Sequence, residues 1–87
     1  MENTRMSMTI DAFKVVTEAL SKVKKRPPVA KIIAIDYDEE ADILYVRFKH
    51  SKTVDNEPLD EDGLILASLN ERNEVIGLTV MEASALA

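Results

Sequence analysis

The residues best suited to chemistry in this chain of 87 residues are carboxylates gathered in one short stretch. Four acids stand there at alternate positions, the spacing with which a calcium-binding loop presents its oxygen ligands: Asp36, Asp38, Glu40 and Asp42. Counted from the first of them, an EF-hand loop needs Gly at its sixth position and a bidentate Glu at its twelfth, but these are Ala41 and Arg47. The sequence therefore excludes an EF-hand. We expect a solvated acidic turn that binds divalent cations weakly if at all.

No other combination of residue types supports catalysis. His50 is the only histidine and the chain has no cysteine, so transition-metal sites and Cys/His nucleophilic sites lack ligands or partners. Gly63 and Gly77 are the only glycines, which excludes a glycine-rich phosphate loop. Acid–base catalysis needs paired carboxylates in a cleft, whereas the acids of the 38–42 and 58–63 loops belong to a small sheet with little material for a pocket. We predict no catalytic, cofactor-binding or metal-binding residue and no cofactor.

The acidic stretch forms the turn of a predicted β-hairpin, around which the rest of the chain is arranged. Its first arm is the apolar run Ile32–Tyr37 and its second arm is Ile43–Lys49. Apolar residues fill every other position of the second arm, so one face of that strand is wholly apolar. The turn at 38–42 has no Gly or Pro, which favours a loop of several residues around a type I turn. We expect the ring of Tyr45 to lie over the sheet with its hydroxyl in water.

A helix is predicted ahead of the hairpin, from about Thr9 to Lys25. Its apolar residues recur at three- and four-residue steps and form one stripe: Ile10, Phe13, Val16, Leu20 and Val23. Thr9 is the expected N-cap, with Asp11 in the positive first turn. Cations crowd the expected last turn, where the helix dipole favours them: Lys22, Lys24, Lys25 and Arg26. Pro27-Pro28 ends the helix, and we expect its stripe to pack on the sheet or else on another chain.

The remaining elements follow the first hairpin. In order they are a weak strand at 52–57, a loop at 59–63, a strand at 64–69, a turn at 70–73, a strand at 74–81 and a final helical turn in 82–87. The weak strand has one large apolar residue, Val54, and ends at Pro58, so we place it at or near an edge. Gly77 in the middle of the last strand indicates a bulge or the close approach of another backbone.

The two hairpins together resemble a family of small bacterial and archaeal proteins known as domain of unknown function 2283. The family pattern is a Tyr-Asp-x-x-x-Asp-x-Leu-Tyr hairpin, a variable acidic middle and a Val-Ile/Val-Gly-Ile-Glu-Ile-Leu strand. It is carried here by Tyr37-Asp38, Asp42, Leu44-Tyr45 and residues 75–81, with Thr79 where the family often has an acid. The resemblance covers about residues 32–84 and leaves out the N-terminal helix. It implies a fold and no assigned activity, although members are sometimes proposed as antitoxin partners of small toxins.

Bulk properties indicate a single domain, residues 1–87, with 1–28 as N-terminal tail and helix and 29–87 as the sheet region. The N-terminus is too polar for a signal peptide and no apolar run reaches the roughly 20 residues of a membrane span, so we expect a cytoplasmic protein without membrane contact. The net charge of −5 argues against nucleic acid as a partner, because such binders present a basic surface. A chain this small buries little surface, and it has no disulfides or zinc site to stabilise it. Oligomerisation is therefore the remaining way in which it could gain stability.

If the strands form an antiparallel meander, the charged loops separate to the two ends of the sheet. One end collects the acids Asp38, Glu39, Glu40, Asp42, Asp60, Glu61 and Asp62. The other end collects Lys24, Lys25, Arg26, Lys31, Lys49, His50, Lys52 and Arg72, diluted by Glu71 and Glu74. One interpretation is a charge-complementary interaction surface, and the other is that polar loops are charged by default.

The sequence thus predicts an α+β domain in which the N-terminal helix packs on a mostly antiparallel five-stranded sheet built from two β-hairpins. Two functions remain open. The first is a non-enzymatic protein-interaction module, with an antitoxin-like partner of a small toxin as one form of it. The second is a small enzyme, or a ligand- or metal-binding protein, that uses the carboxylates of the 38–42 and 58–63 loops.

Apolar patterning also predicts a core and an assembly. The core is expected to contain Leu44, Val46, Phe48, Ile76, Leu78 and Val80. The second hairpin has apolar residues on both faces, whereas one helix of about 17 residues spans about 25 Å and covers a single face. Soluble monomers rarely leave such a patch bare, so we predict a homodimer or higher oligomer that pairs these faces or the helices. The competing prediction is that a different protein covers the patch.

Overall fold

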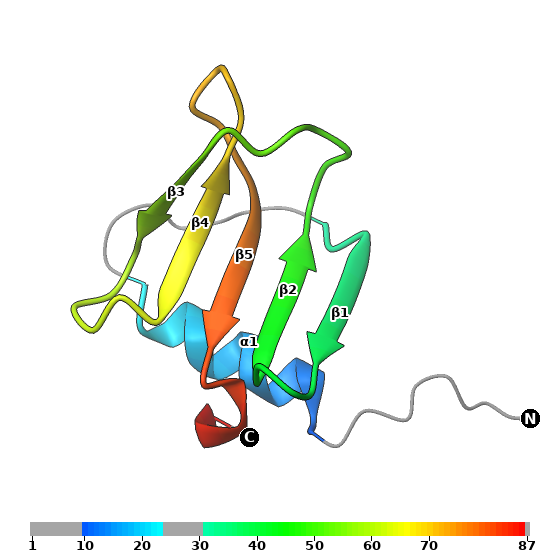
Figure 1. Ribbon diagram of the computed structural model, residues 1–87, viewed down its shortest axis with the longest axis vertical. Helices are drawn as coiled ribbons and strands as arrows, with labels where there is room; N and C mark the ends of the chain where they lie inside the picture. The colour runs from blue at the N-terminus through cyan, green and yellow to red at the C-terminus, as the bar shows by residue number, and fades with distance from the viewer. Residues whose placement is uncertain (1–9, 24–30, 87) are drawn as a thin grey trace, which may run out of the picture.

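Figure 1 shows the computed structural model of the protein, which describes residues 10–23 and 31–86. One helix, one sheet and a short 3₁₀ helix make up the fold: α1 (Ala12–Ser21), β1 (Ala34–Asp38), β2 (Ile43–Arg47), β3 (Asp55–Pro58), β4 (Ile65–Leu69), β5 (Val75–Met81) and η2 (Ala83–Leu86). All neighbouring strands pair antiparallel, and α1 packs against one face of the five-stranded sheet. The predicted α+β class and both hairpins are confirmed.

The order of the strands differs from a simple meander. The sheet runs β1-β2-β5-β4-β3, so β2 pairs with β5 and the chain crosses over before it reaches β3. The reason lies in apolar content, because β5 is buried along most of its length whereas β3 (DNEP) carries no large apolar side chain. The most apolar strand takes the centre and the most polar strand takes the edge, where Pro58 costs no ladder hydrogen bond. The predicted edge position of this strand is confirmed.

The helix is shorter than the sequence predicts and has a different cap. Its N-cap is Asp11 rather than Thr9: the backbone N–H of Lys14 donates to Asp11 Oδ1 at 3.2 Å. The helix ends at Ser21 with Lys22 as C-cap, four residues before the predicted end. Three of the predicted C-terminal cations, Lys24, Lys25 and Arg26, and both prolines lie outside the described residues, as does Thr9.

The predicted apolar stripe of α1 is confirmed in part, because Val16 is buried and Ile10 and Val23 pack against the core cluster, but it is wrong for Phe13 and Leu20. Val15, Val16 and Ala19 are the buried residues, whereas Phe13 is 74% exposed and Leu20 is 39% exposed. The sequence favours Phe13 and Leu20 because they are large apolar residues at helical spacing. Small and β-branched side chains let the helix axis approach the sheet closely, so the face that carries them is the one that packs.

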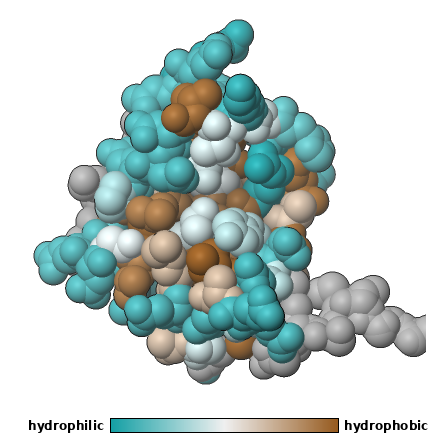
Figure 2. Space-filling view, viewed as in Figure 1, coloured by the Kyte–Doolittle hydropathy of each residue, from teal (hydrophilic) through white to brown (hydrophobic). Residues whose placement is uncertain are grey.

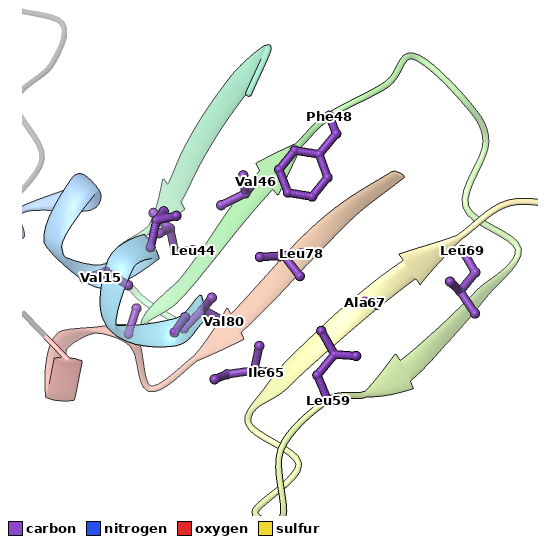
Figure 3. Packing of buried hydrophobic residues seen from close by; sticks show 13 residues of the cluster. Val15, Leu44, Val46, Phe48, Leu59, Ile65, Ala67, Leu69, Leu78 and Val80 are labelled. Carbon is purple, nitrogen blue, oxygen red and sulfur yellow. The ribbon is translucent and has the colours of Figure 1, made fainter. Parts of the chain in front are cut away.

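The core lies between α1 and the sheet, as Figure 3 shows with Val15 of the helix beside Leu44 and Val80 of the strands. All six predicted core residues are buried, with exposures between 0% and 8%: Leu44, Val46, Phe48, Ile76, Leu78 and Val80. Ile76, although fully buried, stands apart from the main cluster. Leu59, assigned to a loop by the sequence, is 1% exposed and is part of that cluster.

Gly77 marks the predicted irregularity of β5. A Cβ atom at this position would stand 2.5 Å from the carbonyl oxygen of Val46 on the neighbouring strand. The register between β4 and β5 also shifts at Ser68/Leu69, so that Leu69 pairs with Val75 one position further along. The close approach of another backbone and the bulge are therefore both present.

Candidate functional site

The acidic turn between β1 and β2 uses its carboxylates to hold itself together. Asp38 Oδ1 accepts hydrogen bonds from the backbone N–H groups of Glu40 at 3.1 Å and Ala41 at 3.2 Å. Asp42 adopts the left-handed conformation, with φ 57°, that closes this loop without a glycine. Two of the four alternating acids are thus committed to turn geometry, which supports the interpretation of a structural turn.

Asp42 also connects three separate parts of the fold. Its Oδ1 accepts from the hydroxyl of Tyr37 at 2.6 Å and from the backbone N–H of Ser84 at 3.0 Å, and its Oδ2 accepts from Ser84 Oγ at 2.7 Å. Its carbonyl oxygen accepts from the N–H of Ala83. These donors stabilise the ionised carboxylate and lower the pKa of Asp42, with the Tyr37 hydroxyl as the largest cause and Ser84 next. The carboxylate fastens η2 to the first hairpin.

The two acidic loops do not assemble into one carboxylate site. The 38–42 loop joins β1 to β2 and the 58–63 loop joins β3 to β4, at opposite edges of the sheet with β5 between them (Figure 1). Asp60 accepts a hydrogen bond from the N–H of Ile65, so this carboxylate too is used locally. Hollows beside 60–62 are lined with Lys22 and residues of the C-terminal end, and by none from 38–42. Among the described residues, no three His, Cys, Asp or Glu side chains could share a metal ion.

A basic hollow lies at the other end of the sheet, between the segment after β2 and the β4–β5 turn. Its volume is about 430 Å³, and its lining consists of Lys49, His50, Ser51, Lys52, Asn70, Glu71, Arg72 and Glu74. The guanidinium of Arg47 donates to the carbonyl oxygens of Lys49 at 3.2 Å and Ser51 at 3.0 Å, and so positions the first wall. Asn70 orders the second wall, because its Oδ1 accepts from the N–H groups of Arg72 and Glu74.

Within the basic hollow, the carboxylate of Glu74 is neutralised by neighbouring side chains. Glu74 accepts from the side-chain amide of Asn70 at 2.8 Å and lies 3.4 Å from the ammonium of Lys49. The Asn70 hydrogen bond, followed by the Lys49 contact, lowers the pKa of Glu74. Lys52 and Arg72 remain exposed, so this end of the molecule keeps positive charge in a chain whose net charge is −5.

The sheet face opposite α1 carries an apolar patch. Residues directly opposite one another in an antiparallel ladder share a face. One row across the strands is Tyr45, Thr79, Leu66 and Pro58, and a second row holds Ile43, Met81 and Leu64. Figure 2 shows this face, with hydrophobic atoms gathered over its lower middle part and hydrophilic atoms around them. We refer to these seven residues as the open face.

The open face is partly accessible although its members are large. Tyr45 is 42% exposed and Met81 is 36% exposed, while Ile43, Leu64 and Leu66 are half-buried. No described segment covers this face, since α1 and the main core cluster lie on the other side. The predicted placement of Tyr45 on the sheet surface agrees with its exposure.

The predicted separation of acidic and basic residues to the two ends of the sheet is retained in the corrected strand order. An antiparallel sheet alternates strand direction whatever the order, so each turn stays at the end to which the meander assigned it. The described acids at 38–42 and 60–62 therefore lie at one end, joined by Glu82, and the basic hollow lies at the other. The predicted residues 24–26 lie outside the described part of the chain.

Sequence reasoning missed the link between Tyr37, Asp42 and Ser84. Spacing alone placed the tyrosine and the aspartate in one hairpin, five residues apart, but Ser84 is 42 residues from Asp42. A hydroxyl residue shortly after the last strand was the one available signal. Ser84 can be linked to Asp42 only when β5 is known to pair with β2, because this pairing brings the C-terminal end of β5 beside the first turn.

Comparison with known proteins identifies the sheet region. A family model described as "Protein of unknown function (DUF2283)" matches residues 34–84, which include all five strands. No curated protein and no solved structure matches the chain. Within the described residues, no helix is both long and apolar enough to cross a membrane.

Proposed function

This chain belongs to the DUF2283 family of proteins of unknown function, and we propose that it is a non-enzymatic protein-interaction module which pairs with a second copy through its open face. The observation that carries the proposal is the apolar patch on the sheet face opposite α1. Large apolar side chains that remain accessible in rows across four strands are typical of a surface that another protein covers. Its expected place of action is the cytoplasm.

A second copy is favoured over other occupants by the shape and chemistry of the patch. Face-to-face packing of two sheets buries alternating side chains from both, and the open face supplies such a set without any helix. Two-fold pairing of identical patches is the commonest way in which soluble proteins form oligomers. A chain of 87 residues without cysteine has a small core and no disulfide bonds. Pairing with a second copy would therefore add stability that the single chain lacks.

The residue types of the open face suit a protein partner better than a small molecule. Tyr45 and Met81 are among its members, and aromatic residues and methionine are enriched at protein interfaces. The basic hollow is lined mainly by polar and charged side chains, two of which, Lys49 and Glu74, form an ion pair. Ser51 and His50 both line the basic hollow, where the Ser51 hydroxyl accepts a hydrogen bond from the side-chain amide of Asn70 at 3.3 Å.

The proposal is tested by measuring the mass of the protein in solution. Light scattering at micromolar concentration should give about twice the chain mass of 9.7 kDa. Leu66→Lys places a charge in the middle of the open face and should return the protein to a mass near that of a single chain. Circular dichroism would show that the variant keeps its fold.

Phe13→Lys is the matched control, because Phe13 is exposed on α1, away from the open face. It should leave the pairing intact. Dissociation by Phe13→Lys but not by Leu66→Lys would show that the helices pair instead. A monomeric wild-type protein would overturn self-pairing and leave the open face for a different protein, such as the small toxin that the family resemblance suggests.

A further inference from the structure

The open face can be paired with a copy of itself in two limiting orientations. A two-fold axis must lie parallel to the interface, and it runs either along the strands or across them. In the aligned class of sheet packing the strand directions of the two sheets stay within about 30° of one another, and these two axes produce that class. An axis along the strands brings like ends of the two sheets together, whereas an axis across the strands brings each end against the opposite end of the other copy.

The two ends of this sheet carry opposite charge. The acidic end holds eight carboxylates, seven in the turn and the loop and one directly after β5: Asp38, Glu39, Glu40, Asp42, Asp60, Glu61, Asp62 and Glu82. Lys22 lies beside the loop. Five cations lie at or near the basic end, against Asp55, Glu71 and Glu74: Lys31, Arg47, Lys49, Lys52 and Arg72. The apolar rows of the open face lie between these ends, so pairing brings the ends of two copies into proximity.

An axis along the strands would place the acidic loops of both copies against each other. Like charges brought together across an interface oppose association, while complementary potentials favour it and fix the register. We propose that the copies pair about an axis across the strands, so that the acidic end of each copy lies over the basic end of the other. This inference rests on the proposed self-pairing and adds its orientation and the residues that select it.

The same rotation predicts which charges meet. An axis across the strands keeps β1 of one copy on the same side as β1 of the other while exchanging the ends. The tip of the 38–42 turn, with Glu39 and Glu40, extends beyond the apolar rows and then approaches Arg47 and Lys49 of the second copy. The acids at 60–62 approach the basic hollow beside Lys52 and Arg72. Each contact occurs twice because of the two-fold symmetry.

Charge reversal at each end tests the orientation. The acidic-end variant Glu40→Lys/Glu61→Lys and the basic-end variant Lys52→Glu/Arg72→Glu change exposed side chains that make no hydrogen bond in the described structure. Each should weaken the dimer about tenfold or more by analytical ultracentrifugation, because several exposed pairs become repulsive at once. The chain that carries all four changes has complementary ends again and should recover most of the affinity.

Salt supplies an independent readout. Raising sodium chloride from about 0.1 M to about 1 M shortens the screening length from about 10 Å to about 3 Å, so the wild-type dimer should weaken. A dimer that tightens in the acidic-end variant, or that is unaffected by both reversals, would overturn the orientation while leaving self-pairing through the open face intact. A monomeric wild-type protein would instead overturn the proposed function itself.

Discussion

Asp42 is the residue at which the greatest number of separate segments meet. Its side chain accepts from Tyr37 in β1 and from Ser84 in η2, and its own backbone is in the left-handed region that ends the turn. The Tyr-Asp-x-x-x-Asp part of the family pattern therefore has a structural explanation. Its tyrosine and second aspartate bond to each other, and its first aspartate caps the turn between them.

We predict that Asp42→Asn destabilises the protein at neutral pH and that this effect disappears in acid. Hydrogen bonds hold the pKa of Asp42 below the usual 3.8, so the folded state favours the ionised form. The stabilisation is complete above pH 3.8 and is lost as the pH falls through the lower pKa of the folded state. Urea unfolding of both proteins from pH 7 down to pH 2 measures the difference. A difference that does not depend on pH would contradict the role of the charge.

Two phenylalanines allow a test of burial at single positions. Phe48 is 8% exposed within the core cluster, whereas Phe13 is 74% exposed on α1. Phe48→Ala should lower the free energy of unfolding by about 3–5 kcal/mol, because it leaves a cavity. Phe13→Ala should change it by no more than about 0.5 kcal/mol. Thermal and urea melts of the two variants check this, and equal effects would show that the helix has been placed on the wrong face.

At the scale of elements, β5 determines how the sheet is assembled. It is the central strand, it pairs with β2 and β4, and its backbone at Gly77 comes so close to Val46 that no side chain fits. The β1–β2 hairpin joins the β3–β4–β5 unit through the pairing of β2 with β5, in which Gly77 lies opposite Arg47. Gly77 is therefore required by the packing of two strands, and not by a turn.

We predict different rescue behaviour for the two glycines. Gly77→Ala should cost about 1–3 kcal/mol, because its Cβ atom meets a backbone oxygen. Gly63 has φ 72° and open space around it, so Gly63→Ala should cost about 1–2 kcal/mol from backbone strain alone. Asn tolerates the left-handed region, so Gly63→Asn should recover most of this loss, whereas Gly77→Asn should be at least as destabilising as Gly77→Ala. Urea melts of the four variants measure these changes in the free energy of unfolding. Recovery of stability by Asn at both positions would refute the steric explanation for Gly77.

At the scale of the whole molecule, the carboxylates of the acidic end are divided between two separate loops. Its two loops lie at opposite edges of the sheet, and Asp38, Asp42 and Asp60 are engaged by the backbone. We predict that millimolar calcium or magnesium moves the melting temperature very little. Differential scanning fluorimetry with and without the cations measures this. A large shift that Glu40→Gln and Asp62→Asn remove would restore the hypothesis of a carboxylate site.

The open face is likewise a property of the assembled sheet. Its members come from four strands, and only the pairing of β2 with β5 brings Tyr45 and Ile43 beside Thr79 and Met81. Period-two patterning in the second hairpin indicated that both faces carry apolar residues. Which of them lie side by side depends on strand order, and the strand order is not a local property.

The local rules of the chain determined the fold class, both hairpins, the edge strand that ends at Pro58 and the alternating core residues of β2 and β5. These features follow from side-chain period and from the backbone limits of proline and glycine, which act over a few residues. Tertiary structure alone decided that β5 separates β2 from β4, that Val15 and Ala19 rather than Phe13 face the core, and that Ser84 reaches Asp42. Each of these is a competition between distant segments for the same buried surface. The outcome depends on how closely whole elements can pack, which a periodic pattern does not contain.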